Sequence, residues 1–267
     1  MIDELAQAIK EKRAMLFVGA GVSVGLGAPT WSGLIDRIAE LLDYDPDVFS
    51  ALESNYLTSA EYYKIKKGTI GNLRSWMDNN WAVEDGILSK SVVHQLICDL
   101  DFPIIYTTNY DRNIESIHKI RGKPHTKIAN IGDMKGSVEG TQIIKLHGDF
   151  DDDNSIVLTE SDYFERLSFE SPLDIKLRSD SLSKVILFVG YSLTDINVRL
   201  LLYKLWKLWS DSDFADKRPK SFLFLNKPNA VQETVLEEWG VNTIISEDSD
   251  PGKSLENFLK DLKDKIQ

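Results

Sequence analysis

The sequence contains a single cysteine, Cys98, among its 267 residues. An intramolecular disulfide is therefore excluded, and so is a cysteine-rich zinc site, because structural zinc takes four Cys or His ligands. Its apolar surroundings predict that Cys98 is a buried core thiol. The four histidines show no metal-ligand spacing, so we expect no bound metal; they are His94, His118, His125 and His147.

Long apolar runs and positive charge are also scarce. No run approaches the ~20 residues that cross a bilayer, and the N-terminus lacks the basic and apolar regions of a signal peptide. We therefore expect a cytoplasmic protein without membrane contact. With 31 Lys and Arg against 42 Asp and Glu, the net charge is −11. An acidic chain repels a phosphate backbone. The basic groups at 64–67 and 217–220 are predicted to be solvated surface, and no direct nucleic-acid binding is expected.

Five apolar runs of strand length alternate with segments of helical periodicity, which predicts an α/β fold with a doubly wound, parallel sheet. Helical spacing is seen at 2–9, 34–42, 198–209 and 254–262, and segment 43–98 has little strand character. We interpret 43–98 as a small helical insertion lobe within one domain spanning 1–267. The predicted strands are 14–18, 102–107, 142–146, 185–189 and 221–225.

Three polar motifs each follow one of these runs, where open α/β sheets bind ligands. The first, Gly19-Ala20-Gly21-Val22-Ser23, is a glycine turn that could aim backbone N–H groups at a phosphate. Val24 stands where a dehydrogenase fingerprint needs its third glycine, and the chain has no ATPase P-loop. Taken alone, the turn could equally be a tight structural turn.

The other two motifs are Thr107-Thr108-Asn109-Tyr110-Asp111 and Lys145-Leu146-His147-Gly148. Asn109 could form an Asx turn before the next helix, or its amide could position a water or a ribose hydroxyl. His147 could be a hydrogen-bonded core histidine, or a base, since its ordinary pKa is near 6.5.

Together with Gly190-Tyr191-Ser192-Leu193, these motifs resemble the sirtuin family. The resemblance covers about residues 12–246 and is closest to the bacterial sirtuin-like branch found as effectors of anti-phage defence. It implies a Rossmann-like sheet that binds NAD, and cleavage of the nicotinamide–ribose bond through an oxocarbenium-like transition state. By the same resemblance, Asn109 holds the ribose and the attacking water. His147 acts as general base or polarises a ribose hydroxyl.

The resemblance also implies a set of NAD-binding residues. Asp111 supports the loop and the nicotinamide pocket, Thr108 belongs to the same binding loop, and Asp195 pins the following helix. The pyrophosphate is lined by Gly19, Ala20, Gly21 and Ser23, and the adenosine half meets Gly190, Ser192 and Asn226.

Two departures from protein-deacylating sirtuins favour water as the nucleophile. One cysteine cannot build their four-cysteine zinc lobe, and their Pro-Asp-Phe-Arg stretch is replaced by Ala28-Pro29-Thr30-Trp31-Ser32. We therefore expect an NAD hydrolase that releases nicotinamide and ADP-ribose. The alternatives are an NAD-dependent protein deacylase and a non-catalytic module that binds NAD or ADP-ribose.

Unrestrained NAD consumption would kill the host cell, so we expect the activity to be gated. Almost all of the 267 residues are needed for the fold. The trigger is therefore expected in trans, from a ring-forming ATPase, a short Argonaute or a nucleotide-sensing subunit. Homo-oligomer formation is also expected.

Overall fold

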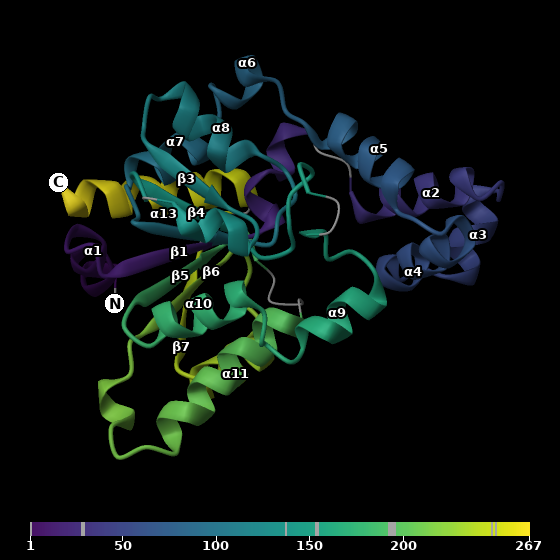
Figure 1. Ribbon diagram of the computed structural model, residues 1–267. Coiled ribbons are helices and arrows are strands. Elements are labelled where there is room, and N and C mark those ends of the chain that lie inside the picture. Colours follow the sequence, from purple (N-terminus) through teal and green to yellow (C-terminus); the bar gives the residue numbers. More distant parts are fainter. Residues whose placement is uncertain are drawn as a thin grey trace.

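A parallel sheet forms the centre of the protein (Figure 1). The computed structural model describes residues 2–27, 30–136, 138–152, 155–191, 196–246, 248 and 250–267. Within these residues the sheet has seven strands in the order β3-β4-β2-β1-β5-β6-β7, and every neighbouring pair is parallel. The strands are β1 Ala14–Val18, β2 Ile104–Thr107, β3 His125–Ile128, β4 Thr141–Lys145, β5 Val185–Val189, β6 Ser221–Leu225 and β7 Val241–Ile245.

Helices cover both faces of the sheet, which confirms the doubly wound, Rossmann-like α/β fold. One face is covered by α1 (Ile2–Lys10), α7 (Val92–Asp99), α8 (Asn113–Ile120) and α13 (Pro251–Ile266). The opposite face is covered by α10 (Pro172–Ser181), α11 (Ile196–Ser210) and α12 (Ala230–Glu238).

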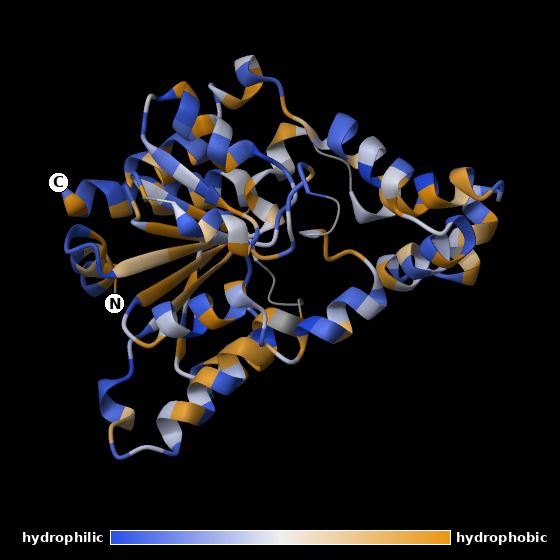
Figure 2. Ribbon diagram, viewed as in Figure 1, coloured by the Kyte–Doolittle hydropathy of each residue, from blue (hydrophilic) through white to orange (hydrophobic). Residues whose placement is uncertain are grey.

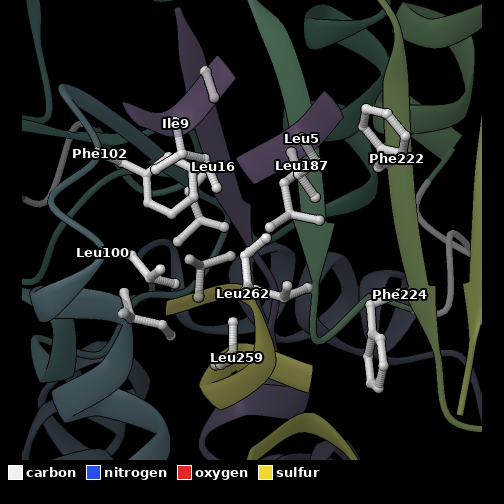
Figure 3. Packing of buried hydrophobic residues seen from close by; sticks show 14 of the residues in the cluster. Leu5, Ile9, Leu16, Leu100, Phe102, Leu187, Phe222, Phe224, Leu259 and Leu262 are labelled. Atoms are coloured by element: carbon white, nitrogen blue, oxygen red, sulfur yellow. The ribbon is translucent and has the colours of Figure 1, made fainter. Parts of the chain in front are cut away.

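The central strands read as unbroken apolar runs because both of their faces are buried. In β1, Leu16 points to the core shared with α1 and α13, whereas Met15 and Phe17 point to the core shared with α10 and α11. Figure 3 shows the first of these cores, where Leu5 and Ile9 lie over Leu16 and Leu187. Figure 2 shows the same burial by hydropathy: the central strands are orange, and the helices around them carry blue, hydrophilic residues.

A second group of helices lies beside the sheet, at the right of Figure 1. It consists of α2 (Trp31–Leu41), α3 (Pro46–Leu52), α4 (Tyr56–Lys67) and α5 (Gly71–Trp81). These helices share a separate apolar core, which Phe150, Ile156 and Leu158 join from the segment after β4. We call α2–α5 and this segment the small lobe.

The small lobe differs in extent from the predicted insertion at 43–98. It includes α2, and it excludes α7, which packs on the sheet next to α13. The short helix α6 (Asp85–Leu88) lies between α5 and α7 in the chain. The helix α9 (Glu160–Arg166) connects the lobe to the sheet. The assignment of 1–267 to one domain stays a prediction.

Two strands were not predicted from the sequence. They are β3 and β7, the two edges of the sheet. Their sequences, His-Thr-Lys-Ile and Val-Asn-Thr-Ile-Ile, mix polar with apolar residues, because an edge strand is covered less completely than a central one. Three-residue to five-residue 3₁₀ turns complete the described elements: η1 Ala20–Val22, η2 Val24–Leu26, η3 Ile131–Lys135 and η5 Ala215–Lys217. None of the helices among the described residues is long and apolar enough to cross a membrane.

Candidate active site

The predicted site residues meet at the carboxyl edge of the sheet, where three strands end level. Val18 at the end of β1 is paired with Thr107 of β2 and with Val189 of β5. The chain passes from β1 to β2 on one side and returns later to β5 on the other. Such a topological switch point is where open α/β sheets bind ligands, because the loops leave the edge in opposite directions.

The loops after β1 and β5 interlock through their backbones. The amide of Gly19 donates to the carbonyl of Val189, and the amide of Gly21 donates to the carbonyl of Gly190, both at 2.9 Å. A Cβ on Gly19 or Gly21 would lie 2.5 Å or 2.8 Å from the Gly190 carbonyl oxygen. Gly190 itself has a φ of 69°, in the left-handed region that favours glycine. These glycines therefore serve the tight structural turn, and two amides expected to face a pyrophosphate are engaged within the protein.

The loop after β2 is held by hydroxyl groups from its neighbours. Thr107 Oγ1 donates to the Val18 carbonyl at 2.8 Å and accepts from the Asn109 amide at 3.0 Å. The hydroxyls of Thr108 and Tyr191 are hydrogen-bonded at 2.7 Å. Tyr191 follows Gly190 and packs edge-on against Phe17, with ring centroids 5.5 Å apart. The backbone at Asn109 is thus fixed by the hydroxyl of Thr107, and its own side chain is not needed for this turn.

The side chain of Asn109 carries a buried donor that has no acceptor. Asn109 is 8% exposed, and its Nδ2 atom lies out of contact with solvent without a hydrogen-bond partner in the described protein. Buried polar groups are almost always satisfied, so this donor needs an acceptor from outside the described protein, a water or a ligand. The Asx turn before α8 is made instead by Asp111, whose Oδ1 accepts from the Asn113 amide at 3.0 Å.

His147 lies two residues beyond the end of β4 and is 3% exposed. Its Nδ1 is 3.4 Å from the Tyr163 hydroxyl, and the two rings meet edge-to-face at 5.1 Å. Burial, with a smaller contribution from the positive charge of Arg166, lowers the pKa of His147 to about 3. His147 is therefore neutral at physiological pH.

A small pocket opens beside His147 and Thr108. Arg166 lines it and is held in place by Asp174 and by the carbonyl of Leu146, to which its Nη1 donates at 2.5 Å. Phe169, another lining residue, has a φ of 54°, a conformation that bulky side chains rarely adopt. Sequence reasoning missed Arg166 and Asp174, since no strand-end motif contains them.

A fully buried lysine holds the two polar loops together. Lys145 Nζ donates to the carbonyls of Tyr110 and Asp111 at 3.0 Å and 2.6 Å, and lies 3.0 Å from Asp149 Oδ2. Lys145 and Asp149 are both 0% exposed. Lys145 therefore connects the loop that carries Asn109 to the loop that carries His147.

Asp149 is buried, although it begins an acidic stretch, 149–153, whose composition is typical of a solvated loop. Burial alone would raise the pKa of its carboxyl, but the charges of Lys145 and Lys127 and the Asp151 amide outweigh this and lower the pKa to about 2. Gly148, with a φ of 84°, makes the turn between His147 and Asp149. Residues 153 and 154 lie outside the described part of the chain.

The remaining predicted residues are distributed around this edge. Ser23 is buried and accepts from Asn113 Nδ2 at 3.1 Å, while Ala20 and Gly21 are exposed. Burial raises the pKa of the Asp111 carboxyl. Asn226 is exposed at the end of β6 and accepts from the Ser254 hydroxyl at 3.4 Å.

Two predicted residues, Ser192 and Asp195, lie outside the described residues. Across the ranges that the structure does describe, there is no group of three or more His, Cys, Asp or Glu side chains that could hold a metal ion.

This geometry agrees with the comparisons with known proteins. The profile of the SIR2-like domain family matches residues 103–244, which contain both polar loops and the loop after β5. The chain belongs to the SIR2-like domain family. The resemblance to sirtuins is thereby confirmed on a region that includes Asn109, His147 and Gly190.

Curated relatives of this SIR2-like chain carry names that describe activity and context. The chain is 33% identical over 208 residues to NAD(+) hydrolase ThsA of Enterococcus faecium, a match that covers 76% of the chain and 42% of that protein. It is 28% identical to NAD(+) hydrolase ThsA of Cytobacillus dafuensis, over 77% of the chain and 40% of that protein. Defense-associated sirtuin 2 of Bacillus subtilis is 26% identical over 88% of the chain and 23% of its own length. The chain thus spans less than half of each of these proteins.

Proposed function

We propose that this chain hydrolyses NAD to nicotinamide and ADP-ribose. The observation that carries the proposal is the buried Nδ2 of Asn109, which lacks an acceptor at the same sheet edge as neutral His147. A hydroxyl of the nicotinamide ribose, or the attacking water, is an acceptor of the right kind for this amide. The names of the ThsA relatives support NAD as the substrate.

In the proposed reaction, the bond between ribose C1′ and the nicotinamide nitrogen breaks and its electron pair leaves with nicotinamide. Water then forms a bond from its oxygen to C1′ and loses one proton to solvent. The positive charge that develops on the ribose in the transition state makes C1′ reactive toward water. Asn109 would hold the ribose or the water at the distance needed for attack, a positioning effect that fixes the reacting atoms relative to each other.

The pKa of His147 favours one of its two predicted roles. A base works best when its pKa is near the operating pH, whereas burial lowers that of His147 to about 3. A neutral imidazole is, however, a good hydrogen-bond acceptor. We therefore assign His147 the task of accepting a hydrogen bond from a ribose hydroxyl, rather than that of removing the proton from water.

The remaining binding residues extend the proposal along the dinucleotide. The pyrophosphate would lie at the turn of Gly19, Ala20, Gly21 and Ser23, where Ala20 and Gly21 are exposed. Thr108 and Asp111 would support the nicotinamide side. The adenosine half would lie toward Gly190 and Asn226, because β5 and β6 stand on that side of β1. Ser192 is proposed as an adenosine contact from the resemblance to sirtuins alone.

We further propose that the activity serves anti-phage defence in the cytoplasm and is gated. The name of the Bacillus subtilis relative supports the context. The trigger would come in trans from a ring-forming ATPase, a short Argonaute or a nucleotide-sensing subunit, or through assembly into a homo-oligomer. Direct nucleic-acid binding is not part of the proposal, and the net charge of −11 supports this.

The direct test is incubation of the protein with NAD, alone and with the products of neighbouring genes. Nicotinamide and ADP-ribose are then quantified by chromatography. We expect equal amounts of the two products without any acylated peptide. A strict requirement for an acylated peptide would indicate a deacylase instead. An NAD-induced thermal shift without nicotinamide release under any of these conditions would indicate a binding module.

A further inference from the structure

His147 contacts a tyrosine that comes from outside the motifs at the strand ends. The Tyr163 hydroxyl lies 3.4 Å from His147 Nδ1, and the same hydroxyl lies 3.4 Å from that of Tyr56. His147 and Tyr163 are both buried, at 3% and 5% exposed. These three side chains therefore lead from the loop after β4, through α9, to α4 of the small lobe, which lies next to α9 in Figure 1.

The helix that carries Tyr163 is fixed at both of its ends. The Asp162 carboxylate caps its first turn and lies 3.2 Å from the ammonium of Lys64 on α4. At the end of α9, Arg166 donates to the Leu146 carbonyl. Because Tyr163 lies between these two attachments, its hydroxyl has a defined position beside the loop after β4.

Tyr56 is also fixed by its surroundings. It is the first residue of α4, and its ring stacks on that of Trp31, the first residue of α2, with ring centroids 4.1 Å apart. The second hydroxyl of the series is therefore placed by ring packing inside the small lobe.

The hydrogen bond at Nδ1 decides what the other ring nitrogen of His147 can do. His147 is neutral because burial lowers its pKa. A neutral imidazole has one N–H donor and one acceptor, and the partner of one nitrogen determines which of the two carries the proton. If Nδ1–H donates to the Tyr163 oxygen, Nε2 carries the lone pair. The Tyr163 hydroxyl can then donate its own proton to the Tyr56 oxygen.

We propose that Tyr163 is a positioning residue that holds the proton of His147 on Nδ1 and thereby keeps Nε2 as the acceptor for a ribose hydroxyl. The inference rests on the proposed function, in which His147 accepts a hydrogen bond. Without the Tyr163 oxygen, the proton moves toward Nε2, the nitrogen that carries it in most neutral histidine side chains in water. His147 would then present a donor where the proposed reaction needs an acceptor.

The first test measures the tautomer itself and needs no turnover. Protein labelled with ¹⁵N-histidine is studied by long-range ¹H–¹⁵N NMR at about pH 8, above the ordinary histidine pKa near 6.5. His147→Gln identifies the His147 signals among the four histidines. We expect Nδ1–H in the wild type. In Tyr163→Phe, which keeps the ring and removes only the hydroxyl, we expect the proton to shift toward Nε2.

A second pair of tyrosines in the small lobe provides a matched control. The hydroxyls of Tyr44 and Tyr62 lie 3.0 Å apart. Tyr62→Phe removes a hydroxyl of the same kind from α4, but one whose partner is Tyr44 rather than Tyr163, so it should leave the tautomer of His147 unchanged. Tyr56→Phe should shift the tautomer in the same direction as Tyr163→Phe, but less.

The second test measures nicotinamide release under conditions in which the wild type turns over NAD, with NAD binding followed by calorimetry. We expect Tyr163→Phe to lower turnover at least about tenfold, as removal of a histidine's hydrogen-bond partner does at metal sites. NAD binding should change much less, and Tyr62→Phe should keep the turnover of the wild type. Circular dichroism checks that each variant is folded.

Three results would overturn the proposal. They are a wild-type His147 with its proton on Nε2, an unchanged tautomer in Tyr163→Phe, and a changed tautomer in Tyr163→Phe with the turnover of the wild type. Failure of the wild type to release nicotinamide under any condition would overturn the proposed function instead. The tautomer measurement would still decide whether Tyr163 holds the proton of His147 on Nδ1.

Discussion

Two pairs of loops meet at the same sheet edge and are built in opposite ways. The loops after β1 and β5 are joined backbone to backbone, with the amides of Gly19 and Gly21 used inside the protein. The loops after β2 and β4 are joined by the buried ammonium of Lys145. Among the described residues of these four loops, only the second pair presents a buried side-chain donor, Asn109 Nδ2, without an acceptor. The loops after β1 and β5 thus fix the backbone at this edge, and the loops after β2 and β4 supply the side chain that can bind a ligand.

The largest effect on this comparison is expected from Lys145→Met. The change leaves Asp149 buried without its main counter-ion and removes two donors from the Tyr110 and Asp111 carbonyls. Loss of one partner of a buried ion pair costs about 3–5 kcal/mol, which urea unfolding would measure.

Two controls accompany this variant. Lys207→Met removes an exposed pair with Asp211 and is expected to leave the stability nearly unchanged, because solvent screens such pairs. Adding Asp149→Asn to Lys145→Met should restore part of the lost stability, because the unpaired charge is removed. Equal costs for Lys145→Met and Lys207→Met would show that the buried ammonium does not hold the polar loops.

The glycine loops are tested by comparing Gly190→Ala with Gly27→Ala. Both glycines have a φ in the left-handed region, 69° and 77°. A Cβ on Gly190 would lie 2.7 Å from the Val22 amide nitrogen, whereas a Cβ on Gly27 would meet no atom of the described residues within 4 Å. We expect Gly27→Ala to cost about 1 kcal/mol from backbone strain alone, and Gly190→Ala to cost clearly more. Similar thermal unfolding of the two variants would contradict the interlocked loops.

A smaller effect concerns the pH dependence of stability. The folded pKa of His147 is lowered to about 3, below its unfolded value near 6.5. Between these values the unfolded state binds a proton that the folded state does not, so stability falls as the pH falls from about 6.5. One such histidine contributes a slope of about 1.4 kcal/mol per pH unit.

A second buried histidine, His94, is expected to contribute to the pH dependence in the same way and gives an independent comparison. Burial lowers the pKa of His94 to about 4, so it contributes in the same pH range. His147→Gln should reduce the slope of unfolding free energy between pH 5 and 6, and His94→Gln should reduce it separately. An unchanged slope in His147→Gln would contradict a neutral, buried His147.

Much of this edge could be predicted from the sequence, because it depends on local patterns. Continuous apolar runs identify β1, β5 and β6, which are buried on both faces. The polar residues at the ends of β2 and β4 stand out against these runs. For this reason the sequence alone assigns Asn109 and His147 to one edge of the sheet.

What could not be predicted depends on contacts between distant residues. The aspartates at 149 and 151 look alike in sequence, yet Asp149 is fully buried because Lys145 comes from the strand beneath it, and Asp151 is 62% exposed. Arg166 reaches the pocket from α9 and is paired with Asp174, a partner that only the folded chain brings close. The tight approach of Gly190 to Gly19 and Gly21 is likewise visible only in three dimensions.

The most direct test of the account is nicotinamide release by Asn109→Ala, under conditions in which the wild type turns over NAD, with NAD binding measured separately by calorimetry. The control Asn80→Ala removes an exposed amide that donates to the Trp76 carbonyl and should keep full activity. We predict that Asn109→Ala lowers turnover at least about 100-fold, as loss of a positioned donor does in other active sites, while NAD still binds. Turnover by Asn109→Ala close to that of Asn80→Ala would contradict the assignment of the active site.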